Sequence, residues 1–376
     1  MNWKSILNSF KIKSGLERVY IFLLPLTFLI YNPAYSQVDN AGDILRAGSE
    51  DAEVLLTEYL KPFGSGFGAD LNSGWFTSAR PLKTFGFDLR VSVSASFVPV
   101  YDRSFDVSTL NLNAVQLLDG PSETPTVFGD DTATSRLGST DFNDSNQLNE
   151  EIFSFNMPKG SGYHLVPAPM AQFSLGLPGH TQATLRYSPE LVIDNDYSVR
   201  IFGIGGLIGL NQLLFNDRLP FDLSIQGGMM DLSANAKFEV LPPEDDRIQN
   251  DYPDSEWEGQ AINFDTNTFT TNLVIGKRFS ILSLFGGVGY QHSSTDITTK
   301  GPYPVVIPHL DGTNPGGTTH QIQSVSVPIN ITLDGANEIH GLGGLRLKLG
   351  FISISTSYTV AEYSTLRASV GIMIRS

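Results

Sequence analysis

The six histidines are the first side chains to consider for catalysis, because imidazole is the commonest general acid or base in enzymes. They are His164, His180, His292, His309, His320 and His340. None is paired at a metal-binding spacing, and the sequence holds neither a Gly-x-Ser-x-Gly elbow nor a His-Glu-x-x-His helix. A hydrolase could still assemble Ser, His and an acid or amide from neighbouring strands, with His340 as its histidine. We expect no enzyme, no metal site and no cofactor.

Charged residues on the polar side of alternating segments could bind an anionic ligand or pair with one another. Asp88, Arg90, Arg346 and Lys348 occupy such positions. Charged side chains inside a protein are usually paired. We therefore predict that these four residues form an ion network in the interior, with binding of an anionic ligand as the alternative.

Residues 197–210 combine an apolar face with nearby charge. One side of this predicted strand carries Phe202, Ile204 and Ile208 where polar groups are expected, and Arg186 and Arg200 lie close in sequence. Apolar ligands gain free energy from surfaces that are shielded from water. The pattern predicts a site for an amphipathic ligand such as a fatty acid, with its carboxylate on a guanidinium. The alternative is a plug helix packed on the same face.

Strands would position all these residues. From 84 to 97 apolar and polar residues alternate, so that Phe85, Leu89 and Val93 face one way while Arg90 and Ser94 face the other. Two to four weaker candidates within 103–165 and 299–336 bring the predicted total to 12–14 strands. Ten segments carry the alternation strongly: 84–100, 166–177, 181–191, 196–208, 219–240, 260–276, 279–298, 338–349, 351–360 and 364–374.

This pattern predicts an all-β fold, an antiparallel transmembrane β-barrel over residues 84–376. Apolar side chains would face lipid and polar side chains would line the lumen. Short turns near 178–180 and 276–278 alternate with long segments at 101–165, 241–259 and 299–336. Outer-membrane barrels have short periplasmic turns and long external loops, which sets the expected orientation.

The residues before the barrel divide into two parts. Basic residues precede an uncharged run at 19–31, and Ala34-Tyr35-Ser36 offers a cleavage site, so residues 1–36 are predicted to be a cleaved secretory signal peptide. Residues 37–83 begin with a one-sided helical pattern that Ser49 could cap and that stops at Lys61-Pro62. We expect this segment to plug the lumen or cap its periplasmic mouth. The alternative is a helix packed under the barrel mouth.

Composition agrees with an exported membrane barrel. The chain has no cysteine, which excludes a lipoprotein anchor, disulfides and thiolate metal sites. Only 17% of its residues are charged, against about 25% in soluble domains. Its net charge of −15 argues against nucleic acid as a partner, because phosphate contacts need Lys and Arg.

The order of a signal peptide, a plug-like segment, turn motifs and a barrel resembles the FadL type of long-chain fatty-acid transporter. The motifs also resemble a family of outer-membrane proteins of unknown function from Bacteroidota. The segments that carry this likeness are Tyr59-Leu60-Lys61-Pro62, Gly74-Trp75, Gly86-Phe87-Asp88-Leu89, Ala183–Tyr187, Phe202–Gly205 and Leu219–Leu223. The resemblance implies a barrel in the outer membrane and a hydrophobic substrate.

These patterns predict a protein of the Gram-negative cell outer membrane. The expected function is passive transport of hydrophobic or amphipathic small molecules such as fatty acids. One alternative is a structural or adhesive barrel without transport, and a second is a hydrolase built into the barrel. The expected partners are outer-membrane lipid and lipopolysaccharide, the barrel-assembly machinery and a small hydrophobic ligand.

Overall fold

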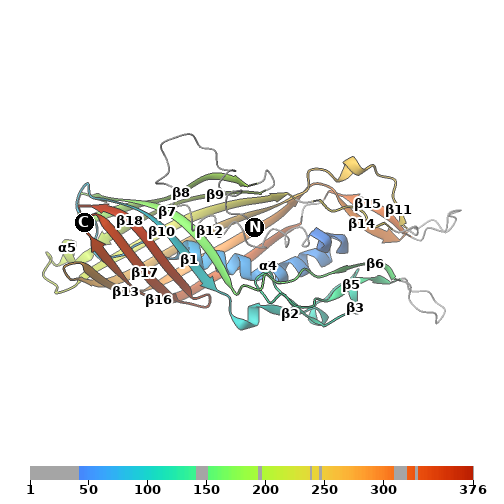
Figure 1. The fold of residues 1–376 in the computed structure, drawn as a ribbon, viewed down its shortest axis with the longest axis horizontal. Coiled ribbons are helices and arrows are strands. Elements are labelled where there is room, and N and C mark those ends of the chain that lie inside the picture. The colour runs from blue at the N-terminus through green and yellow to red at the C-terminus, as the bar shows by residue number, and fades with distance from the viewer. Residues whose placement is uncertain are drawn as a thin grey trace, which may run out of the picture. The chain divides into compact units, whose positions relative to one another are not determined.

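Ten strands form a closed antiparallel barrel (Figure 1). The computed structural model describes residues 42–140, 151–193, 197–237, 239–244, 248–308, 320–326 and 329–375. The barrel strands are β1 (Phe87–Phe97), β7 (Leu165–Leu177), β8 (Thr181–Ile193), β9 (Tyr197–Gly209), β10 (Asp222–Lys237), β12 (Ala261–Arg278), β13 (Leu282–Lys300), β16 (Asn330–Leu349), β17 (Ile352–Val360) and β18 (Thr365–Ile374). Each pairs with the next along the chain, and β18 pairs with β1 to close the ring. The predicted antiparallel barrel is confirmed, whereas the predicted signal peptide lies outside the described residues.

The predicted number of 12–14 barrel strands is wrong. The ten strongly alternating segments all become barrel strands, but the weaker segments form three small separate sheets. Those sheets contain β2 (Ser104–Asp106) with β4 (Glu123–Pro125), then β3 (Gln116–Asp119) with β5 (Arg136–Thr140) and β6 (Glu151–Asn156), and β11 (Ile248–Gln249) with β14 (Tyr303–Pro308) and β15 (His320–Val325). Crossing a bilayer takes about 9–11 residues of tilted strand. These strands of two to six residues are too short for that.

The two ends of the barrel differ in their connections. One end, the turn end, carries the short connections 178–180, 279–281 and 350–351 together with α5 (Leu210–Leu214). The other end, the loop end, carries the long connections 98–164, 238–260 and 301–329, which hold the small sheets and the short helices η2 (Val100–Asp102), η3 (Val107–Thr109) and η4 (Asp254–Trp257). β1 begins and β18 finishes at the turn end.

Apolar side chains cover the outer face of the barrel. On β1 the prediction holds: Leu89 points outward and is 50% exposed, whereas Ser94 points inward and is fully buried. The same alternation on the other strands produces a continuous band, the apolar belt. Its members include Phe173, Leu185, Phe202, Ile204, Ile208, Ile225, Met229, Phe269, Leu273, Leu284, Val288, Leu345, Ile354 and Val370.

The long strands reverse their polarity beyond the belt. On β12 the outer face changes from Phe269 to Asn267 and Asp265 toward the loop end, while the inner face changes from Thr266 to Phe264. The loop-end part of the barrel therefore resembles a water-soluble protein, with polar groups outside and an apolar core inside. That core is built from strand residues such as Phe264, Ile297 and Leu333 and from the helix described next.

Helix α4 (Ser49–Asn72) follows η1 (Gly42–Ala47) and lies inside the barrel, in contact with β1, β7, β10, β12, β13 and β16. Its apolar stripe, including Leu55 and Tyr59, packs in the loop-end core. The predicted stop at Lys61-Pro62 is wrong, because the helix continues through Pro62. Proline removes one helical hydrogen bond, and packing on all sides offsets that loss. Among the described helices, none is long and apolar enough to cross a membrane.

Gly68 of α4 touches the barrel wall without a side chain. A Cβ at this position would overlap the hydroxyl group and Cβ of Ser293 on β13. We expect Gly68→Ala to lower the free energy of unfolding by about 1–3 kcal/mol, the usual cost of overpacking. Adding Ser293→Gly should recover part of this loss, so a double-mutant cycle in urea should show coupling between the two sites. Additive effects would mean that the helix does not approach the wall here.

Candidate functional site

Residues 73–83 fill the interior of the barrel at the height of the apolar belt, and we call them the lumen segment. The ring of Phe76 packs edge-on against Phe285, with centroids 5.6 Å apart. Ala79 lies against Gly276 of β12. At the turn end the Phe85 N–H donates to the Gly176 carbonyl at 2.8 Å. An extended stretch of chain, not the helix itself, therefore blocks this part of the lumen.

Two buried arginines of the barrel wall hold the junction between α4 and the lumen segment. Arg186 of β8 donates to the carbonyl oxygens of Leu71 at 2.7 Å and Ser73 at 2.6 Å. Arg367 of β18 donates to the same Ser73 carbonyl at 2.7 Å. The last carbonyls of a helix lack intrahelical partners and carry partial negative charge. The two guanidinium groups, which we call the carbonyl clamp, supply hydrogen-bond donors and positive charge to these carbonyls.

Trp75 packs beside the carbonyl clamp. The Arg186 guanidinium carbon lies 3.9 Å from the centre of the Trp75 ring, a cation–π contact. The indole fits because Gly205 and Gly228 face it, where a Cβ would lie 2.7 and 2.6 Å from ring carbons. Such a contact is worth about 2 kcal/mol where water is excluded. The wall strands β9 and β10 are thus shaped to receive the plug.

At the loop end, the buried carboxylate of Asp51 ties α4 to the connection after β1. It accepts hydrogen bonds from the backbone N–H groups of Asn113 at 2.8 Å, Ala114 at 2.7 Å and Val115 at 3.0 Å. The expected cap at Ser49 is wrong, because Gly48 occupies the N-cap position and makes no side-chain bond. One of the two acidic residues in the first turn of the helix, Asp51, therefore organises a loop.

Asp102 makes a second loop-end contact with α4. Its carboxylate pairs with the Lys61 ammonium at 2.7 Å and accepts the Tyr363 hydroxyl at 2.7 Å. The hydrogen bond to Asp102 raises the pKa of Lys61. Burial is the main cause that raises the pKa of Tyr363, and the hydrogen bond to the Asp102 carboxylate raises it further. The helix, the connection after β1 and the turn between β17 and β18 are held together at this point.

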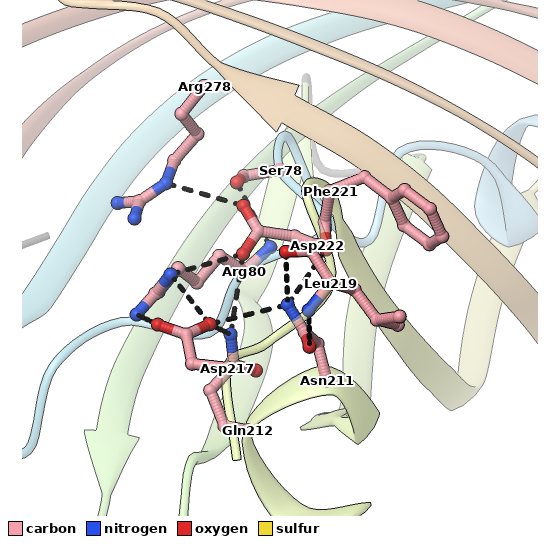
Figure 2. Close-up of polar contacts among 9 residues, drawn as sticks. All are labelled: Ser78, Arg80, Asn211, Gln212, Asp217, Leu219, Phe221, Asp222 and Arg278. Atoms are coloured by element: carbon pink, nitrogen blue, oxygen red, sulfur yellow. Dashed lines mark hydrogen bonds and ion pairs between the residues drawn. The ribbon is translucent and has the colours of Figure 1, made fainter. Parts of the chain in front are cut away.

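At the turn end, a polar network fixes the last part of the lumen segment (Figure 2). Arg80 makes a two-pronged ion pair with Asp217, at 2.8 and 3.2 Å, and reaches Asp222 at 3.3 Å. Arg278 approaches the other oxygen of Asp222 at 3.4 Å, and Gln212 of α5 donates to both carboxylates. The hydrogen bond from Arg80 lowers the pKa of Asp217. The pair therefore persists until the pH falls below the ordinary range of an aspartate.

A small cavity lies beside the lumen segment. One cavity of about 10 Å³ lies between Trp75, Asn272 and His340, enough for roughly one water molecule. His340 is buried, and its Nε2 lies 2.8 Å from the Asn272 side-chain oxygen. No serine hydroxyl of the described residues is bonded to this histidine. Within the described ranges, His and acidic side chains form no group of three that could hold a metal ion.

The structure separates the residues expected to bind a fatty acid. Arg186 faces the lumen, but it is fully buried and bonded to the plug. Phe202, Ile204 and Ile208 lie on the outer face, 44–47% exposed, and are part of the apolar belt. Arg200 is exposed on the same outer face, beyond the belt. The predicted apolar lumen patch is therefore wrong.

Glycine residues explain why the sequence pattern assigns the inward and outward faces of β9 the wrong way round. Both faces of β9 read as apolar, and the true inward set is Gly203, Gly205 and Leu207. Only the position of Trp75 across the lumen shows why small residues face inward there. Alternation alone cannot assign the faces of a strand when both lack polar side chains.

The residues of the expected ion network do face inward. Asp88 and Arg90 are buried and form an ion pair. Arg346 is buried and donates to Ser283 at 3.3 Å and, weakly, to Thr77 of the lumen segment at 3.5 Å. Lys348 lies near the turn end, partly exposed. Asp88 and Arg90 therefore pair as predicted, whereas Arg346 bonds to hydroxyl groups of the wall and the plug and does not join that ion pair.

Sequence reasoning missed the residues that fix the plug most firmly. Arg367 lies on the polar side of the last strand, which was a usable signal, but its partner is a main-chain carbonyl. Arg80 is separated along the chain by 137 residues from Asp217 and by 142 residues from Asp222. No local pattern marks such contacts.

The fold and the site define a closed β-barrel that is plugged by its own N-terminal segment. Residues 16–374 match a family described as a family of unknown function, DUF6588, and the chain belongs to that family. Among curated proteins, none matches this chain.

Three solved structures that are similar to this chain share little sequence with it. The translocator domain of the autotransporter NalP from Neisseria meningitidis is 10% identical, with 87% of this chain and 99% of that chain covered and a TM-score of 0.23. The transport unit of the autotransporter AIDA-I from Escherichia coli is 11% identical, with 92% and 99% covered and a TM-score of 0.25. A FadL homologue from Pseudomonas aeruginosa is 9% identical, with 84% and 97% covered and a TM-score of 0.24. At these TM-scores the likenesses add nothing to what the strand pairing shows.

Proposed function

We propose that the protein is an outer-membrane β-barrel with its turn end in the periplasm and its loop end at the cell surface. The apolar belt supports insertion in lipid: on β18 it runs from Leu366 to Ile374, the length that a tilted strand needs to cross a bilayer. Exposed aromatic residues occur at both edges of the belt, as interfacial girdles do. They are Phe85, Phe215, Phe279 and Phe351 toward the turn end, and Phe97, Tyr101, Tyr163 and Tyr358 toward the loop end.

The first candidate function is structural or adhesive: the barrel is a closed membrane anchor for the structure that the long connections form at the loop end. The filled lumen carries this proposal, because two buried arginines hold the start of the lumen segment and the ion pair of Arg80 holds its later part. We propose no enzymatic activity and no cofactor. Outer-membrane lipid, lipopolysaccharide and the barrel-assembly machinery remain the proposed partners.

A gated channel is the second candidate. The wall at belt height is polar, with Ser92, Ser94 and Thr270 facing inward, and a polar wall would line a hydrated path if the lumen segment moved. This observation favours polar solutes over the fatty acids expected from the sequence. The apolar face of β9, which the sequence predicts to line the lumen, points outward.

We expect the unmodified protein to give no steady ion current in planar bilayers, because inward side chains at belt height, such as Ser94 and Thr270, are fully buried around the lumen segment. Liposomes that contain the protein should likewise take up neither hydrophobic nor small polar solutes faster than empty liposomes. A steady current or selective uptake by the unmodified protein would favour the channel over the closed anchor.

A further inference from the structure

We propose that η1 and the first turn of α4 lie at the cell surface, on the opposite side of the membrane from the first residue of β1. The choice of the cell surface over the periplasm rests on the proposed orientation of the barrel. That η1 shares a side with the long connections rests only on its contacts and on the direction of α4.

The start of α4 and the preceding η1 lie among elements of the loop end. The apolar residues Ile44 and Leu45 of η1 belong to the same buried core as Phe153 of β6 and Tyr303 of β14. One turn into α4, Asp51 binds the backbone of the connection after β1. Every one of these partners lies beyond the belt, in the long connections.

From there the chain moves steadily toward the turn end. Tyr59 contacts the loop residue Lys159 at 3.2 Å, and Asn72 donates to the His292 carbonyl at 3.0 Å, at the upper edge of the belt. Farther on, Trp75 lies at belt height against Gly205, and Gly86 meets Arg375 where β1 begins. The chain therefore crosses the full height of the belt once, inward from the loop end, before the first barrel strand starts.

η1 and the first turn of α4 therefore form part of the surface that the protein presents at the loop end, together with the connection after β1.

The absence of native cysteine makes the test direct, because each single-cysteine variant carries one reactive thiol. Ser49→Cys, at the exposed first position of α4, reports on the start of the helix. Ala133→Cys, exposed in the connection after β1, reports on the loop end, and Ser280→Cys, exposed between β12 and β13, reports on the turn end. Each full-length variant is treated with a membrane-impermeant maleimide, in intact cells and after permeabilisation.

We expect Ser49→Cys and Ala133→Cys to label fully in intact cells, and Ser280→Cys to label only after permeabilisation. Protection of Ser49→Cys in cells where Ala133→Cys labels would overturn the inference and leave the proposed orientation standing. Labelling of Ser280→Cys with protection of Ala133→Cys would overturn the orientation itself, and with it the surface location.

Discussion

Replacing Arg186 with alanine is expected to open the barrel to ions and to destabilise it by about 3 kcal/mol or more. The variant would remove the arginine partner of the buried Leu71 carbonyl, at a cost of about 1–3 kcal/mol, and would leave the Ser73 carbonyl with Arg367 alone. It would also remove the cation–π contact with Trp75. Single-channel recording and urea unfolding in lipid vesicles measure the two effects. A further substitution, Arg367→Ala, should enlarge both because it frees the same Ser73 carbonyl.

Arg200→Ala is the matched control for this experiment. Arg200 lies on the neighbouring strand β9, but it is exposed on the outer face, where substitutions usually change stability by less than about 0.5 kcal/mol. It should leave the conductance unchanged. An Arg186→Ala protein that is as stable and as closed as the Arg200→Ala protein would show that the carbonyl clamp does not hold the plug.

Leu273→Arg is expected to destabilise the barrel by about 2–4 kcal/mol in lipid, the cost of a basic side chain at mid-bilayer. Leu273 lies on the outer face of β12 within the apolar belt and is 47% exposed. The control is Asn267→Arg, which lies on the same face of the same strand just beyond the belt. Near the interface the cost falls to about 0–1 kcal/mol. Equal stability of the two variants in urea titrations would contradict membrane insertion through this belt.

The sequence by itself determined the barrel and the identity of its strands. Period-two alternation on strands such as β1 and β18 reports which face of a strand meets an apolar environment, and that signal is local. All ten strong segments became barrel strands with ends within a few residues of those expected, apart from β16, whose start at Asn330 extends the predicted segment. The weak segments failed as barrel strands because β-propensity does not say which partner a short strand will find.

Only the tertiary structure decided what fills the barrel and which way the plug runs. The extension of α4 past Pro62 depends on contacts with six strands, and the faces of β9 depend on the fit of Trp75 against Gly205 and Gly228. The clamp formed by Arg186 joins a side chain to main-chain carbonyls 113 and 115 residues away. Every backbone has the same carbonyl groups, so a sequence carries no mark of the ones that a distant arginine will bind. The direction of α4 through the ring follows from those contacts and from no residue pattern.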